Sequence, residues 1–388
     1  MRRAAALAGA ALLIALPSLA RAGAKIEITE DRYVTLGAGV RTSFTAAEDG
    51  APSRDDFSKD FDLESFRLYT GGQLSKNLAL EFNAEYNGDQ EVRVLDGLAK
   101  LNLGEQFNIW AGRFLPPSDR ANLSGPYYLN SFDFPFVQQY PAIFAGRDEG
   151  AAYWGQVGEG MFKWQLGAFE GDSTNQDVDG SNQDGDLLYS GRLTFNFWDP
   201  EPGYYNSSTY YGDKDILALG LVYMYQNDGA GQLVMPDTAP VTSPSEAVID
   251  EGDFRGWNVD FLMERKLDAG VLTLEGAYYD YDLDDNGSLS NEGDGYFGVL
   301  SFLFPGEFGV GDLKARLQPL VRYQLFDPEL SGGEKHSRVD FGLNFIIDQH
   351  NTRLSLTVSR DEDSPTAMGP GFELDDRTIF KLGLQVQL

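Results

Sequence analysis

Charged side chains recur at alternate positions of stretches that are otherwise apolar or small. Eight basic residues follow this pattern: Arg41, Arg67, Lys100, Arg192, Lys314, Arg316, Arg322 and Arg353. Six acidic residues share it: Glu81, Glu85, Asp96, Asp260, Glu264 and Glu275. Residues two apart in a β-strand lie on the same face, so both sets are expected on one polar face. Basic rows beside water would attract anions, and carboxylates among them would weaken that preference.

A short acidic segment resembles a calcium-binding loop. Asp282, Asp284 and Asn286, followed by Gly287, match the first six positions of such a loop. Gly293 stands at position twelve, where a glutamate ligand is expected. Two interpretations stay open: a weak loop-bound calcium, which would be the only cofactor, or a solvated loop without an ion. A second acidic cluster consists of Asp177, Asp179, Asp184 and Asp186.

Residues suited to catalysis are few. The chain has no cysteine and two histidines, His336 in a long loop and His350 in a tight turn. Neither is expected on a strand beside a serine nucleophile, so the sequence does not favour a catalytic triad or a histidine metal centre. Thiolate metal sites and cysteine nucleophiles are excluded. No enzymatic activity is predicted.

β-strands must position the charged residues, because the dominant period from Tyr33 to the last residue is two. No amphipathic helical stripe interrupts this pattern. Sixteen strands are predicted, near 33–45, 62–74, 78–88, 92–103, 107–115, 147–157, 161–171, 186–198, 215–226, 254–265, 271–282, 294–304, 313–326, 338–348, 352–360 and 377–388.

The connections between these strands alternate in length. Tight turns are expected at 75–77, 104–106, 158–160, 267–270 and 349–351, and long polar stretches lie between them. This asymmetry is typical of an outer-membrane β-barrel, which has short periplasmic turns and long external loops. Segment 199–214 is an exception, a long connection on the side with the short turns.

The strands of a soluble β-sandwich or propeller would also alternate polar and apolar residues. The direction in which the apolar face points distinguishes these folds from a membrane barrel. In a membrane barrel the apolar face points to lipid and the polar face to water, and the ring has no edge. In the predicted strand 313–326, Leu317, Val321 and Tyr323 oppose Gln318 and Arg322. The last strand alternates similarly and ends inside the strand, although at Leu388 rather than the usual phenylalanine. An antiparallel transmembrane barrel is therefore predicted.

The N-terminus predicts export. Arg2 and Arg3 precede the apolar run 4–19, and Ala20-Arg21-Ala22 fits a cleavage site. Residues 1–22 are read as a signal peptide rather than an anchor, and 23–388 as the barrel. The mature chain would hold 27 basic and 60 acidic residues, a net charge of −33. No nucleic-acid partner is expected, and hydrophobic residues at 42% argue against a disordered polyacid.

Several short motifs, in order along the chain, resemble the phosphate-selective porin O and P family. They are Gly112-Arg113-Phe114 before Pro116 and Pro117, Gly146-Arg147 with Gly150, Leu166-Gly167-Ala168-Phe169 with Gly171, Gly191-Arg192-Leu193-Thr194, Trp257-Asn258-Val259-Asp260-Phe261, Leu317-Gln318-Pro319-Leu320-Val321-Arg322-Tyr323, and Gly342-Leu343-Asn344-Phe345-Ile346-Ile347 with Asp348-Gln349-His350-Asn351-Thr352-Arg353-Leu354. They cover essentially the whole mature chain.

This resemblance implies a sixteen-stranded homotrimer whose third external loop folds inward and narrows the pore. That loop would be 116–146, packed on the wall by Tyr127, Tyr128, Phe132, Phe134, Phe136 and Tyr140. Leu115 stands where the family's phosphate-selective members would place a basic residue, and this argues against phosphate selectivity.

Two functional hypotheses remain. The first is an outer-membrane porin for passive diffusion of small hydrophilic solutes, with inorganic anions such as phosphate among them or with weak or cation preference. The second is a plugged barrel that serves as an envelope scaffold. Outer-membrane lipid and lipopolysaccharide would be partners in both, and divalent ions would bridge the acidic loops to lipopolysaccharide phosphates.

Overall fold

A computed structural model describes residues 23–48, 50, 56–86, 91–139, 146–171, 186–234, 248–284, 292–310, 313–329, 333–362 and 376–388. The predicted signal peptide, Tyr140, Asn286 and most of the second acidic cluster lie outside these residues. Among the described residues, no helix is long and apolar enough to cross a membrane.

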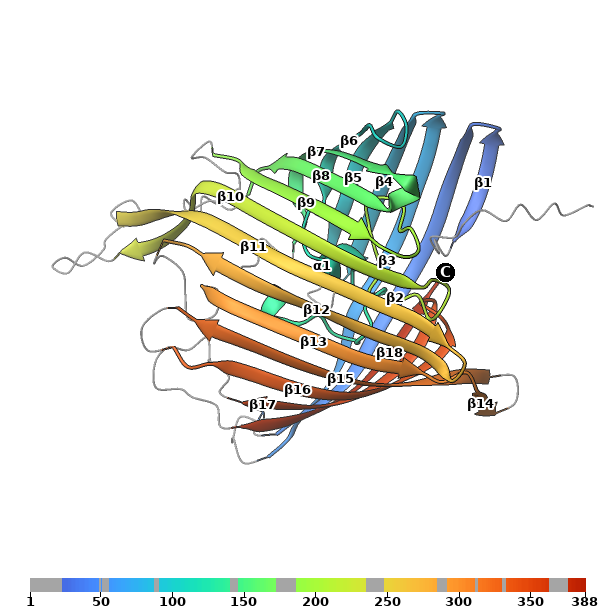
Figure 1. Cartoon of the computed structure of the whole chain (residues 1–388), viewed down its shortest axis with the longest axis vertical. Coiled ribbons are helices and arrows are strands. Elements are labelled where there is room, and N and C mark those ends of the chain that lie inside the picture. Colours follow the sequence, from blue (N-terminus) through green and yellow to red (C-terminus); the bar gives the residue numbers. More distant parts are fainter. Residues whose placement is uncertain are drawn as a thin grey trace, which may run out of the picture.

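The strands form one antiparallel ring (Figure 1). Their bounds are β1 (Ala24–Thr29), β2 (Arg32–Ala47), β3 (Ser58–Ser75), β4 (Leu78–Tyr86), β5 (Val92–Asn102), β6 (Asn108–Phe114), β7 (Asp148–Val157), β8 (Phe162–Phe169), β9 (Leu188–Asn196), β10 (Ile216–Val234), β11 (Val248–Leu267), β12 (Gly270–Asp282), β13 (Gly293–Leu303), β14 (Glu307–Val310), β15 (Leu313–Pro328), β16 (His336–Asp348), β17 (Thr352–Glu362) and β18 (Arg377–Gln387). Three short helical segments are α1 (Arg120–Ser124), η1 (Phe136–Gln139) and η2 (Gly158–Gly160).

Sixteen of these strands make the barrel, and the prediction of a sixteen-stranded antiparallel barrel is confirmed. The ring closes where β18 pairs with β2, from Ile379 opposite Ala47 to Gln387 opposite Gly39. The remaining two strands extend existing ladders: β1 pairs with β2 beyond the end of β18, and β14 pairs with β15 beyond the end of β13. Closure leaves no open edge among the sixteen, as lipid requires.

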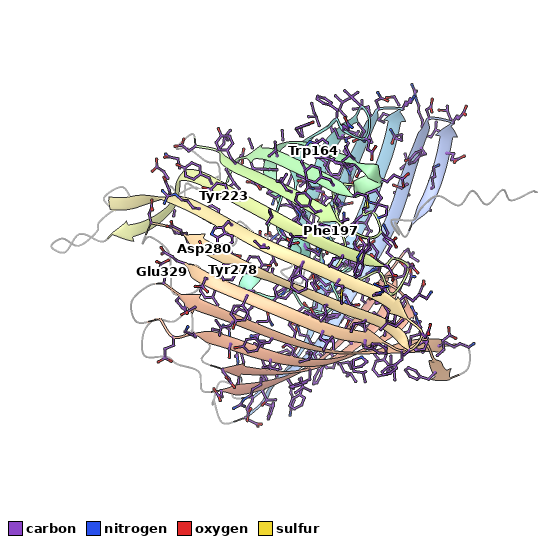
Figure 2. The ribbon with its side chains drawn as sticks, in the orientation of Figure 1. Trp164, Phe197, Tyr223, Tyr278, Asp280 and Glu329 are labelled. Carbon is purple, nitrogen blue, oxygen red and sulfur yellow. The ribbon has the colours of Figure 1, made fainter. Side chains whose placement is uncertain are left out.

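The two faces have the polarity predicted for a membrane barrel. On β18, Phe380, Leu382 and Leu384 are each 38–45% exposed, whereas Gln385 is fully buried. Figure 2 labels further aromatic side chains on the outer surface, Phe197 and Tyr223 among them, which are 57% and 54% exposed. Exposed apolar and buried polar faces are the reverse of a soluble β-sandwich, so the apolar face is the lipid-facing one.

The tight turns gather at one end of the barrel, as predicted. The chain's C-terminus lies at the same end, because the backbone N–H of Leu388 bonds to the carbonyl of Ala38 near the start of β2. Segment 197–215, between β9 and β10, also begins at this end. Its length exceeds what a hairpin needs, and apart from Phe197, Asp199 and Asp213 its residues are buried or partly buried.

Candidate functional site

Two segments occupy the interior of the barrel. The first is loop 3, defined as residues 116–146 and described to 139, which follows β6 and contains α1. The second is the lumen insert, defined as residues 199–214, which enters from the end with the tight turns. Figure 1 shows α1 within the ring of strands. Loop 3 is mostly buried and the lumen insert is largely buried or partly buried, although neither belongs to the wall.

Loop 3 crosses the lumen and bonds to the far wall. The Asn130 amide donates to Ser301 on β13 over 3.0 Å, and the Phe136 backbone N–H donates to Gln324 on β15 over 2.7 Å. On β18, Gln385 donates to the Tyr127 carbonyl over 2.9 Å. These bonds satisfy polar groups that would otherwise be buried without partners.

Glycine in the wall makes room for the aromatic side chains of loop 3. A Cβ added at Gly383 would lie 2.6 Å from the ring of Phe132, and one at Gly39 would lie 2.8 Å from that of Tyr127. Of the six aromatic residues predicted to pack loop 3, Tyr127, Phe132 and Phe136 are buried, Tyr128 and Phe134 are partly buried, and Tyr140 lies outside the described residues.

A buried ionic network joins loop 3, the lumen insert and the wall. The guanidinium of Arg120 on α1 binds Glu201 of the lumen insert with two hydrogen bonds of 2.8 and 3.0 Å. Its backbone N–H donates to Asp260 on β11. Asp260 in turn accepts from Arg192 on β9, and Lys163 on β8 lies 3.4 Å from Glu201. We call these five residues the ionic lock.

Electrostatics hold the Arg120–Glu201 pair of the ionic lock in its charged form. Burial alone would raise the pKa of Glu201, but the cations of Arg120 and Lys163 outweigh it and hold that pKa well below its usual range. Burial would likewise lower the pKa of Arg120, and the carboxylate of Glu201 raises it instead. A buried pair of this kind is stable only while both partners are present.

Two wall carboxylates anchor the rest of the lumen insert. Glu264 on β11 accepts from the Thr209 hydroxyl at 2.6 Å and from the backbone N–H of Gly212 at 2.8 Å. Glu275 on β12 accepts from Ser208 at 2.6 Å. These acidic residues and Asp260 were predicted to line the lumen. In the structure all three are buried in the interior, where Glu264 and Glu275 bind the insert and Asp260 binds Arg120 of α1.

His350 adds a contact from the turn between β16 and β17. Its ring centroid lies 4.7 Å from that of Tyr128 and 4.8 Å from that of Tyr211, which belong to loop 3 and the insert. Burial, with the Arg353 cation, lowers the pKa of His350 to about 3. The neutral imidazole therefore serves as a hydrogen-bonded spacer, with Nε2 3.0 Å from the Thr209 carbonyl.

A cavity of about 600 Å³ remains on the opposite side of the lumen. Its walls come from β2 to β7, from loop 3 around Tyr127, and from the lumen insert around Tyr205. Leu115, the residue directly after β6, also lines the cavity. The cavity has the size of a small-molecule site.

Cations and carboxylates around the cavity lie in pairs. Arg67 binds Glu85 with a nitrogen–oxygen distance of 2.5 Å, and Arg147 binds Asp96 at 3.1 Å. The third pair is Lys100 with Glu81. Thus four of the predicted lumen acids and bases, Arg67, Lys100, Glu81 and Asp96, line the cavity, and Glu85 contacts the lining through Arg67.

The other predicted basic residues have different surroundings. Arg41 and Arg353 donate to carbonyls of loop 3, at Phe132 and Leu129. Arg322 binds Ser131 of loop 3 as well as Asp340 of the wall. These three are therefore loop anchors.

Two basic positions lie away from the buried interior. Arg316 is only partly buried. Lys314 lies on the β14–β15 hairpin with a side chain 67% exposed, and its ammonium lies 3.7 Å from Glu307. Alternation places Lys314 on the inward parity of β15, but the hairpin carries it beyond the buried section of the wall.

The calcium prediction is only partly within the described residues. Asp282 and Asp284 both lie beside Arg255, at 3.3 and 3.2 Å, and Asn286 lies outside the description. The carboxylates of Asp148, Glu149 and Glu170 approach one another within 4.8 Å at the β7–β8 rim. An exposed acidic group of this kind is common without an ion, and the calcium site stays a prediction.

Sequence reasoning missed Arg120, Glu201 and Lys163 of the ionic lock, and also Arg147 and Tyr205. Arg120, Glu201 and Tyr205 lie in connections, where alternation gives no orientation, whereas Lys163 lies on β8, within the predicted strand 161–171. One signal was available: four tyrosines, Tyr204, Tyr205, Tyr210 and Tyr211, occur in the unusually long connection 199–214. That density of aromatic residues indicates packing rather than exposure.

No family model and no curated protein matches the chain. Its structure is similar to those of several bacterial porins. An anion-selective porin from Comamonas acidovorans superposes with a TM-score of 0.57 at 14% identity, over 92% of this chain and 100% of that one. OprB of Pseudomonas putida at high pH superposes with a TM-score of 0.58 at 12% identity, over 92% of this chain and 94% of the OprB chain. Salmonella typhi OmpF in complex with daunomycin superposes with a TM-score of 0.56 at 8% identity, over 94% of this chain and 100% of the OmpF chain.

These identities establish the fold alone, and that fold is the bacterial outer-membrane porin barrel. No family model supports the narrower resemblance to phosphate-selective porins O and P. Vibrio cholerae OmpT, described as an outer membrane protein, is another neighbour, with a TM-score of 0.55 at 13% identity over 92% of this chain and 100% of the OmpT chain.

We predict that removing the charge of Glu201 from the ionic lock strongly destabilises the protein. Glu201→Gln removes the carboxylate opposite the buried Arg120 and should lower the free energy of unfolding by about 3–5 kcal/mol. Urea unfolding in lipid, followed by tryptophan fluorescence, measures this. The matched control is Glu149→Gln, which removes the exposed partner of Arg113 and should cost less than about 1 kcal/mol. Equal effects of the two variants would contradict the lock.

Asp119, the N-cap of α1, predicts a pH dependence. Burial raises the pKa of Asp119 to about 7, and the Asp260 carboxylate adds to the rise. Because an unfolded aspartate has a pKa of about 3.9, the wild-type protein should lose stability as pH rises from about 4 to about 7, with no further loss above.

Asp119→Asn keeps an acceptor for the Tyr279 hydroxyl and removes the ionisation. Relative to wild type, the variant should therefore gain stability between about pH 4 and about pH 8. Thermal unfolding at the two pH values measures the difference. Parallel pH profiles of wild type and variant would show that Asp119 does not titrate in this window.

Proposed function

We propose that this chain is a channel of the bacterial outer membrane through which small hydrophilic solutes diffuse passively. The observation that carries the proposal is the cavity of about 600 Å³ between the barrel wall and the two inserted segments. A closed barrel with a polar interior and an internal cavity suits solute passage. In this proposal loop 3 and the lumen insert together narrow the path to the side of β2–β7.

Selectivity follows from the charge pairs around the cavity. The structural neighbour from Comamonas acidovorans is an anion-selective porin, which makes anion selectivity a candidate property here. In this chain each of the cavity cations Arg67, Lys100 and Arg147 has a carboxylate partner. A cation whose charge is neutralised attracts anions weakly. We therefore propose weak selectivity rather than a phosphate-specific pore, in line with the apolar Leu115 in the cavity wall.

Assembly and surroundings complete the proposal. Vibrio cholerae OmpT is described in a trimer form, and we propose a homotrimer for this chain also. Outer-membrane lipid and lipopolysaccharide are the proposed contacts of the exposed apolar belt. Export through a signal peptide at residues 1–22 stays a prediction.

The second candidate function is a plugged scaffold barrel without channel activity. The observation that favours it is the ionic lock, which fixes loop 3 and the lumen insert to each other and to the wall. If the path beside β2–β7 ends at loop 3, the barrel would carry no current.

Planar-bilayer conductance separates the two functions. The refolded or membrane-extracted full chain should insert in steps and give an ohmic current in potassium chloride. A protein that is shown to be folded in detergent and inserted in lipid, yet opens no ohmic channel, would be a scaffold. A variant of the ionic lock that conducts more than wild type would show that the lock restricts the path.

Neutralising the cavity carboxylates should shift the ion selectivity toward anions. The double variant Glu81→Gln/Glu85→Gln removes the partners of Lys100 and Arg67, so the zero-current potential in a salt gradient should move toward that of an anion-selective channel. The control Glu149→Gln/Glu170→Gln removes the same charge at the rim, outside the cavity lining. A rim effect as large as the cavity effect would show that selectivity is set elsewhere.

A further inference from the structure

The cavity between β2–β7 and the two inserts has a lining that combines charge neutrality with aromatic surface. Three lining cations, Arg67, Lys100 and Arg147, meet three lining carboxylates, Glu81, Asp96 and Glu105. Glu85 adds a further negative charge behind Arg67. The lining thus presents no excess of positive charge, and an anion entering it would meet carboxylates as often as cations.

Aromatic side chains make up much of the remaining lining. The Trp110 ring stacks on Tyr204 with centroids 4.7 Å apart and planes 28° apart. Tyr205 lies beside both, at 5.8 Å from Trp110 and 5.2 Å from Tyr204. Stacking and the contact of Lys100 with the Trp110 ring fix this group in place. Tyr205 is only partly buried and therefore contributes ring surface to the cavity.

Two polar groups at this cavity have no hydrogen-bond partner among the described residues. Within the part of the chain that the structure describes, the Tyr205 hydroxyl makes no hydrogen bond. The adjacent Asn206 also lines the cavity, and its amide Nδ2 has no partner among the described residues. Uncompensated polar groups that line a cavity favour a ligand or water that supplies oxygen atoms.

The local potential around Tyr205 opposes an anion. Burial raises the pKa of Tyr205 well above its usual value, and the carboxylates of Asp96 and Glu81 raise it further, more than Arg147 lowers it. The phenol therefore stays neutral at physiological pH and acts as a donor and acceptor. A neutral solute bears no penalty in this field, whereas an anion does.

We propose that the cavity binds a small neutral polyhydroxylated solute, of the sugar or polyol class, at the Tyr205 surface. Such a solute presents hydroxyl groups to Tyr205, Asn206 and the charge pairs, and its C–H groups to the aromatic rings, whose faces carry partial negative charge. Charge pairs are strong hydrogen-bond partners for neutral hydroxyls. This inference rests on the proposed channel function and names its solute class.

The first test is a titration of wild-type channels with D-glucose, sorbitol and inorganic phosphate at constant ionic strength. Glucose or sorbitol should reduce the current saturably in about the millimolar range, beyond the change in bulk conductivity, and phosphate should not. A saturable effect of phosphate alone would overturn the inference in favour of an anion site.

A single hydroxyl provides the second test. Tyr205→Phe keeps the ring and should raise the half-saturating sugar concentration about three- to tenfold, as expected for one hydrogen bond. Tyr189→Phe is the matched control, because Tyr189 is 57% exposed on the outer face, and it should leave the titration unchanged. If the Tyr205 variant, its control and the wild type give the same half-saturating sugar concentration, the sugar does not bind at Tyr205.

Tryptophan fluorescence in detergent separates this inference from the channel function. Trp110 and Trp154 line the cavity, so sugar binding should change the emission saturably whether or not the barrel conducts. A conducting channel with no sugar response in current or fluorescence would overturn the inference and leave the channel function intact. A saturable fluorescence change without any conductance would support the binding site and refute the channel.

Discussion

Every other feature of this structure depends on the requirement that backbone N–H and C=O groups be paired where lipid offers no partner. The ring meets it by pairing β18 with β2, which leaves none of the sixteen strands with a free edge. Closure also fixes which face of each strand meets lipid. Apolar residues such as Leu382 therefore lie outside, and glutamine and arginine lie inside.

A polar interior can hold polar chain, and loop 3 and the lumen insert use this property. Charged groups in the wall would be costly if left unpaired away from water, and the inserts supply their partners. Arg41, Arg322 and Arg353 bind loop 3, while Asp260, Glu264 and Glu275 bind α1 or the lumen insert. Residues with the composition of a pore lining thus act mainly as anchors over half of the lumen.

The other half of the lumen contains the cavity. Ion pairs there form between residues of the wall, so the wall charges need no inserted segment as a partner. Arg67 with Glu85 and Lys100 with Glu81 join neighbouring strands and need no inserted segment. The result is a neutral, aromatic-lined space in a chain whose net charge is −30. The net charge of the chain is therefore a poor guide to the field that a solute meets inside, since that field is set by local pairs.

The sequence by itself determined the barrel. Alternation with period two and the unequal connections predicted a membrane barrel, whereas the count of sixteen strands came mainly from the family resemblance. The same alternation predicted an inward direction for residues such as Arg192 and Glu264. Alternation is a local property of the sequence and can be recognised without knowing which strands pair, and for this reason the barrel could be predicted. Only the tertiary structure decided that Glu201 reaches Arg120 from a different connection, and that Arg147 completes the charge pairs of the cavity. Those contacts join residues 51 to 81 positions apart through segments without periodicity, so their partners depend on how the closed ring brings the connections together.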